Sequence, residues 1–159
     1  MADYQLAFQL NKALAWDLCR LGTFTVQHTT PPTWFYVYHY QHDDFSDFFL
    51  IGNARPLQKM SEPQFLLAKG GIRPEIYQQI TEACSALPQV LHTDDISLLL
   101  NSDSEKLSSR QKKASARITG IIYDLEIFLM EHFKKKKMNQ ALQTPTRYHT
   151  VEPKKMYTL

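Results

Sequence analysis

The sequence has 159 residues, of which 43% are hydrophobic and 21% are charged. This length predicts one domain, and a composition so close to the globular average excludes wholesale disorder and collagen-like or low-complexity structure. No apolar run approaches the roughly 20 residues that span a bilayer, and the first twenty residues lack the apolar core of a signal peptide. We therefore expect a soluble protein of the cytoplasm.

The chain has two cysteines, Cys19 and Cys84, and both lie in segments whose pattern predicts a helix. Disulfides belong to secretory compartments, and nothing in the sequence indicates a secretory context. We therefore expect two small, buried thiols.

Charges are distributed unevenly along the chain. Overall there are 18 Lys and Arg against 16 Asp and Glu, which gives a net charge of +2. Residues 1–105 contain 6 basic and 12 acidic residues, whereas residues 106–159 contain 12 basic and 4 acidic ones. This asymmetry predicts either an anionic partner for the basic part or docking of the two parts on each other.

Leucines at helical spacing predict an N-terminal helix from Asp3 to about Leu21, with Gly22 just past its end. Three strands are expected next. Residues 23–28 alternate, residues 34–40 are rich in aromatic and β-branched side chains, and residues 48–51 are apolar. Because the connections between them are short, the three strands should form an antiparallel meander.

The second of these strands is apolar on both faces. A strand with one buried face would carry polar residues on the other face. Either helices cover both faces, or one aromatic face is presented to a partner. Phe35 and Val37 lie on one face, and the other face carries Trp34, Tyr36, Tyr38 and Tyr40.

Residues 61–69 and 74–87 predict two helices separated by a glycine pair. Together they resemble a helix-turn-helix in length, but Arg73 and Glu75 would make a poor base-reading surface. A helical hairpin packed on the sheet explains the same residues, and we prefer it. Residues 94–100 are expected to form a further short helix.

The longest periodic stretch begins at residue 102 and predicts a helix to about Lys137. Residues 138–159 lack periodicity and are expected to form a basic tail that is flexible unless docked. We therefore expect a single domain over residues 1–137, followed by this tail. The core should include Leu14, Leu18, Phe49, Ile80, Ile121 and Leu125.

These elements predict an α+β fold. A three-stranded antiparallel sheet should pack against an N-terminal helix and a C-terminal helical group ending in one long helix. The order of elements is similar to that of the small secretion chaperones of bacteria. Those chaperones are acidic overall, whereas this chain ends basic, so the similarity concerns the order of elements alone.

His39 and His42, followed by Asp43 and Asp44, form the cluster with the best metal-ligand chemistry. The two histidines are three residues apart, so on a continuous strand their rings point to opposite faces. Asp43 and Asp44 are typical turn residues. We therefore expect a polar hairpin tip and no metal, and a metal-dependent enzyme at His39 and His42 stays the weaker alternative.

Motifs for other catalysis are missing from the sequence. There is no Gly-x-Ser-x-Gly elbow and no phosphate-binding glycine loop. Neither cysteine has a local signature of an activated thiol. We therefore expect a protein that is not an enzyme and that needs no cofactor.

The basic C-terminal part is the most informative feature. One basic group lies in the first half of the long helix and includes Lys112, Lys113 and Arg117, while residues 134–137 end the helix with four lysines. Basic residues interleaved with aromatic ones can bind nucleic acid, an acidic protein groove, or anionic lipid.

The leading hypothesis is a non-enzymatic protein-binding module: an adaptor, chaperone, inhibitor or accessory subunit. Nucleic-acid binding through the basic helix and tail is the alternative, and a homo-oligomer stays open. The expected partner-binding residues are Trp34, Tyr36, Tyr38, Tyr40, Lys112, Lys113, Arg117, Lys134, Lys135, Lys136 and Lys137.

Overall fold

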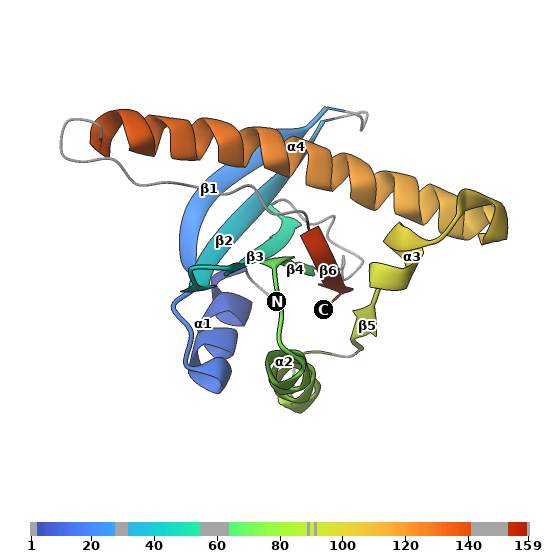
Figure 1. The fold of residues 1–159 in the computed structure, drawn as a ribbon, viewed down its shortest axis with the longest axis horizontal. Coiled ribbons are helices and arrows are strands. Elements are labelled where there is room, and N and C mark those ends of the chain that lie inside the picture. The colour runs from blue at the N-terminus through green and yellow to red at the C-terminus, as the bar shows by residue number, and fades with distance from the viewer. Residues whose placement is uncertain are drawn as a thin grey trace.

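The computed structural model describes residues 3–27, 32–54, 64–88, 90, 92–140 and 153–158 (Figure 1). The fold is α+β, with an N-terminal helix, an antiparallel sheet and a long C-terminal helix. The elements in chain order are α1 (Asp3–Leu14), β1 (Cys19–Val26), β2 (Thr33–Asp43), β3 (Ser46–Asn53), β4 (Phe65–Gly70), α2 (Pro74–Ala86), β5 (Asp94–Asp95), α3 (Ser97–Asn101), a 3-10 turn (Ser104–Lys106), α4 (Ser109–Gln140) and β6 (Pro153–Thr158).

The sheet contains six strands in the order β1-β2-β3-β4-β6-β5, and every neighbouring pair is antiparallel. Figure 1 shows α4 crossing one face of this sheet and α1 and α2 lying on the other. The expected meander of three strands is present as β1 to β3. The expected count was too low, because β4 and β6 extend the sheet on the far side of β3.

Strand β2 contributes side chains to both layers of the core. Tyr36 and Tyr38 belong to the apolar cluster shared with α1 and α2, whereas Phe35 and Val37 belong to the cluster beneath α4. All four side chains are buried. Helices therefore cover both faces of this strand, which is the first of the two alternatives that its composition left open.

The predicted core is confirmed at five of its six positions. The buried residues are Leu18, Phe49, Ile80, Ile121 and Leu125. Leu14 is partly buried and packs against the cluster shared with α1 and α2.

Helix α1 ends at Leu14, seven residues earlier than predicted. Ala15 adopts the left-handed conformation, with φ of 54°, and the backbone N–H of Trp16 donates to the carbonyl of Asn11 over 3.1 Å. This is the geometry of a Schellman helix end, for which the expected residue is glycine. The Asn11 side chain then accepts a hydrogen bond from the Leu18 N–H, 2.7 Å away, so β1 begins at Cys19.

The predicted helix over residues 61–69 is wrong where the structure describes it. Residues 65–70 form strand β4, which pairs with β3 and β6, and residues 61–63 lie outside the described part. A central strand is buried on both faces, so its sequence is a continuous apolar run without alternation. With β4 in place of the first helix, both the helix-turn-helix and the helical hairpin are excluded. The following helix, α2, is confirmed.

Gly70 closes β4 in a conformation that other residues rarely adopt, with φ of +97°. A Cβ at this position would overlap the backbone carbonyl of Phe45. The turn between β2 and β3 therefore packs directly against the end of β4. Ser46, at the start of β3, adds a hydrogen bond from its hydroxyl to the carbonyl of Gly71 over 2.6 Å.

Part of the C-terminal segment belongs to the sheet. Residues 153–158 form β6, which lies between β4 and β5 in the sheet, so this part of the expected tail belongs to the fold. Helix α4 begins at Ser109 and runs to Gln140, later at both ends than predicted. The expected helix over residues 94–100 corresponds to β5 followed by α3.

The expectation of two buried thiols in helices holds for Cys84 alone. Cys84 is buried in α2, whereas Cys19 is exposed at the start of β1. None of the helices in the described part of the chain has both the length and the apolar character needed to cross a membrane.

Candidate partner-binding surface

Helix α4 is the longest element that the structure describes, and one side of this helix contacts the sheet (Figure 1). Its 32 residues correspond to a length of about 48 Å, and in Figure 1 it extends past the sheet at both ends. The inward face of the helix is fixed by a row of buried apolar side chains: Ile118, Ile121, Leu125 and Leu129.

An ion pair further fixes the rotation of α4. Lys69 of β4 pairs with Glu126 of α4, and their side chains are 15% and 31% exposed. The Lys69 ammonium also lies 6.0 Å from the centroid of the Phe49 ring. Tyr123 and Ile127 each lie two residues from the buried Leu125, about 160° around the helix, so they are directed to its outer side.

The outer side of α4 carries an apolar stripe. We define the outer stripe as Tyr123, Ile127 and Met130, whose side chains are 62%, 41% and 71% exposed. Their spacing of i, i+4 and i+7 places them in one line along the helix. Met138, which is 68% exposed, continues this line toward the end of α4.

Basic side chains flank the outer stripe at both ends. Lys112, Lys113 and Arg117 are exposed before it, and the four lysines at residues 134–137 are exposed after it. Lys112 and Lys134 share the outer side with the stripe and lie about 33 Å apart at the rise of an α-helix. Of the expected partner-binding residues, these basic ones are therefore brought to one helix, with an apolar segment between them.

The expected aromatic residues of β2 are placed differently. Tyr36 and Tyr38 are 3% and 7% exposed, and the Tyr36 hydroxyl donates to Gln64 Oε1 over 2.7 Å. Tyr40 is half-buried, and its ring stacks on Trp16 with centroids 4.9 Å apart. Trp34 is 45% exposed. Of these four aromatic residues, Trp34 is therefore the one that is freely accessible to a partner.

His39 and His42 lie on opposite faces of the sheet, as their spacing predicts. The His39 ring stacks on Phe49 and its Nε2 lies 2.7 Å from Asp47 Oδ1, on the side of α4. The His42 ring contacts Phe48 on the other side. Among the residues that the structure describes, no three His, Cys, Asp or Glu side chains are grouped to hold a metal ion.

Both thiols lie in surroundings that favour the protonated form. Burial raises the pKa of the Cys84 thiol to about 11. The pKa of Cys19 is also raised, mainly by desolvation and to a lesser extent by the hydrogen bond to Asp17. A nucleophilic cysteine needs a lowered pKa, so neither environment is that of an activated thiol.

Tyr123, Ile127 and Met130 are the surface residues that sequence reasoning missed. The predicted apolar stripe of the long helix followed the core-facing positions, and these three residues lie outside it. Their own i, i+4, i+7 spacing was the available signal, since it marks a second apolar line on a helix that already has a core face.

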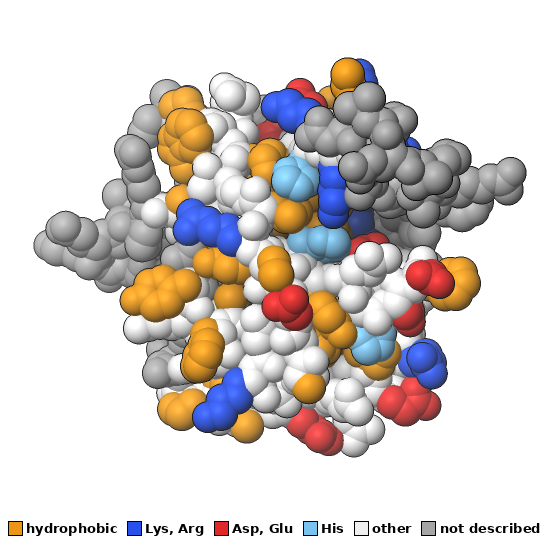
Figure 2. All heavy atoms as spheres, turned by 90° about the vertical axis from the view of Figure 1, so that its left-hand side faces the viewer, with side chains coloured by type: hydrophobic (Ala, Val, Ile, Leu, Met, Phe, Trp, Pro, Cys, Tyr) orange, Lys and Arg blue, Asp and Glu red, His pale blue; other side chains and the backbone are white. Residues whose placement is uncertain are grey.

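Other exposed apolar side chains lie away from the outer stripe. Figure 2 shows the side of the molecule that is on the left in Figure 1, where charged residues of both signs are interspersed with apolar ones. Tyr4 and Phe8 of α1 are 63% and 68% exposed and lie across the sheet from α4.

Comparisons of the chain with protein families, curated proteins and solved structures find no match.

Proposed function

We propose that this protein is a non-enzymatic protein-binding module, an adaptor or accessory subunit that docks an acidic amphipathic helix of its partner on the outer side of α4. The observation that carries the proposal is the outer stripe: three apolar side chains in line on a helix whose opposite side is already buried.

Single exposed apolar side chains are ordinary on protein surfaces. A line at i, i+4 and i+7 is different, because it is the spacing at which one helix contacts another. Tyr and Met are also enriched in protein interfaces, where they supply large contact areas. The outer stripe therefore supports a helical partner segment with its own apolar line.

The flanking lysines indicate the charge of that partner. Lys112 and Lys113 precede the stripe and residues 134–137 follow it, so a partner helix with carboxylates at both ends would complement the surface. A second copy of this chain would bring further lysines to the same surface, with Glu131 as the exposed acid near the stripe. Charge therefore favours a different, acidic partner over self-association.

The proposal is tested with a fluorescent synthetic peptide that carries Leu at i, i+4 and i+7 and Glu groups at both ends. We expect Tyr123→Ser/Ile127→Ser to weaken binding at least about tenfold, because both side chains lose buried contact area. Tyr4→Ser/Phe8→Ser is the matched control, since it removes two exposed aromatic side chains from the opposite face of the sheet. Equal loss in both variants contradicts the proposal.

Four further measurements separate the alternatives. A peptide with Lys in place of Glu should bind more weakly, and added salt should slow association with the acidic peptide. A dimer in light scattering that Tyr123→Ser/Ile127→Ser abolishes would identify a second copy as the occupant. An oligonucleotide that binds tighter than the peptide, with an affinity lost in Lys134→Gln/Lys135→Gln, would favour nucleic-acid binding.

A further inference from the structure

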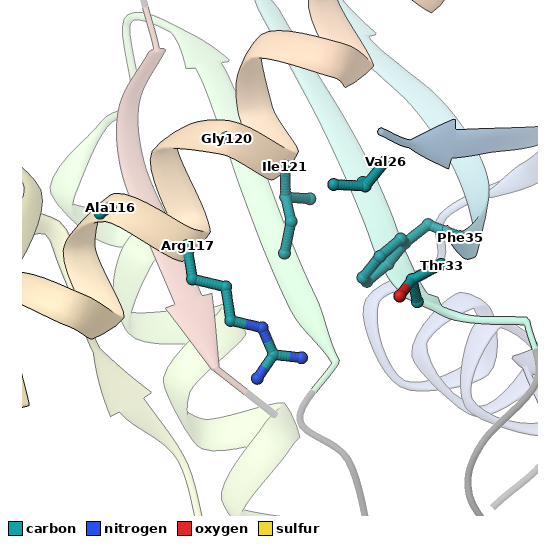
Figure 3. Close-up of a pocket in the computed structure, with 7 residues that line it drawn as sticks. All are labelled: Val26, Thr33, Phe35, Ala116, Arg117, Gly120 and Ile121. Atoms are coloured by element: carbon teal, nitrogen blue, oxygen red, sulfur yellow. The ribbon is translucent and has the colours of Figure 1, made fainter. Parts of the chain in front are cut away.

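We propose that a pocket between α4 and the ends of β1 and β2 binds a medium-chain monocarboxylate, with the alkyl chain inside and the carboxylate on Arg117. The pocket has a volume of about 300 Å³. It lies on the flank of α4, beside the outer stripe, and the proposal does not depend on the docking function. Figure 3 shows the side chains that line it.

The floor of the pocket is apolar and comes from three elements. Val26 of β1, Phe35 of β2 and Ile121 of α4 line it, and all three side chains are at least nine-tenths buried. In Figure 3, the side chains of Val26 and Phe35 point toward Ile121. A floor of this kind favours an alkyl or aryl group and disfavours a polar one.

The helix side of the pocket is open because two small residues form it. Ala116 and Gly120 line the pocket one helical turn apart, and neither has a side chain long enough to fill the space between α4 and the strands. A larger residue at either position would occupy part of the volume. The space is therefore a consequence of the residue types at two positions of α4.

Arg117 supplies the polar end of the site. It is the charged residue among the described ones that line the pocket, its side chain is exposed, and in Figure 3 it extends from α4 to the same side as Ile121. A guanidinium presents parallel N–H donors that match the two oxygens of a carboxylate. An apolar floor beneath one cation selects an amphipathic anion.

The volume sets the size of the ligand. About 300 Å³ lies at the lower end of small-molecule pockets, which suits an alkyl chain of medium length. Octanoate combines an alkyl chain of suitable length with a single carboxylate, and octanol is the same chain without the charge. The pair therefore separates the contribution of the floor from that of Arg117.

The experiment is calorimetric titration of the full chain with octanoate and with octanol. We expect saturable binding of octanoate, and Arg117→Gln should weaken it about tenfold while leaving octanol unaffected. Lys112→Gln is the matched control, because it removes the same charge from α4 outside the pocket lining. We expect this control to bind octanoate as the unchanged chain does.

A second variant tests the cavity itself. Gly120→Leu should fill the pocket and abolish binding of both ligands, and its helical content and melting temperature report whether the fold is intact. The proposal is overturned if octanoate fails to saturate, or if Arg117→Gln and Lys112→Gln weaken its binding equally. It is also overturned if folded Gly120→Leu binds octanoate as well as the unchanged chain.

Discussion

The ammonium group of Lys69 on β4 is paired with the carboxylate of Glu126 on α4, between the sheet and the long helix. This pair joins a central strand to the middle of the helix, one residue before Ile127. Together with the buried apolar row of α4, it holds one side of the helix against the core, so the other side presents the outer stripe. The proposed docking surface depends on the orientation of α4, although neither Lys69 nor Glu126 belongs to that surface.

We expect Glu126→Gln to lower the free energy of unfolding by about 1–3 kcal/mol, because Lys69 would then lose its charged partner in a largely desolvated position. Chemical denaturation measures the change. Glu131→Gln is the control, since the Glu131 side chain is exposed on the same helix and should change the stability by less than about 0.5 kcal/mol. Similar values for both variants would show that the ion pair does not hold α4.

Gly70 is expected to be irreplaceable. Gly70→Ala places a methyl group against the Phe45 carbonyl at a positive φ, so it should cost at least about 3 kcal/mol. Gly71→Ala is the neighbouring control, because a Cβ there meets no atom within 4 Å. Thermal unfolding compares the two variants. A Gly70→Ala protein as stable as Gly71→Ala would refute the close approach of the β2–β3 turn to the end of β4.

Ala15 offers a stabilising change. Ala15→Gly relieves the left-handed conformation at the end of α1 and should raise the free energy of unfolding by roughly 1 kcal/mol. Ala13→Gly, two residues earlier and inside the helix, should lower it by about 1 kcal/mol. Opposite signs in denaturant titrations support the helix end at Leu14. A loss of stability in both variants would place that end elsewhere.

The two thiols should differ in reactivity and in their effect on stability. Cys19 is exposed and Cys84 is buried, so a thiol reagent should modify one cysteine in the folded chain and both after unfolding.

The pKa of Cys84 is raised from 9.0 to about 11. Below pH 9 the thiol is protonated in both states, and as the pH rises toward 11 the unfolded state alone ionises, so stability falls.

Comparison with Cys84→Ala isolates this contribution, because other groups titrate in the same range. The unchanged chain should lose about 2–3 kcal/mol more than the variant over this range. Parallel stability profiles above pH 9 would show that the Cys84 thiol is not shielded from water.

Composition predicted the layers of the fold better than the boundaries of its elements. Strand β2 was recognised by its aromatic and β-branched residues. Its two apolar faces left helices on both sides as one of two alternatives, and Tyr36 and Val37 indeed enter different core clusters. Strand β4 was mistaken for a helix because a short apolar run such as residues 65–68 has no period that separates the two structures. The pairing of β4 with β6 joins segments more than eighty residues apart, which local patterns cannot reveal.

The candidate site was predicted in part. The lysines of α4 were recognised by their charge, whereas the outer stripe between them was overlooked, because Tyr123 and Met130 had no place in the core-facing pattern. The end of α1 was missed for a related reason: Ala15 has the conformation usually taken by glycine, so the sequence carries no stop signal there.

The most direct test of the docking surface is methyl NMR of the full chain labelled at its methionines, titrated with the acidic peptide. The Met130 methyl group, assigned through Met130→Leu, is predicted to shift strongly as its exposed side chain becomes covered, while the indole signal of Trp34 stays in place. An unchanged Met130 signal at saturating peptide, with a shift at Trp34, would contradict the account and place the partner on β2.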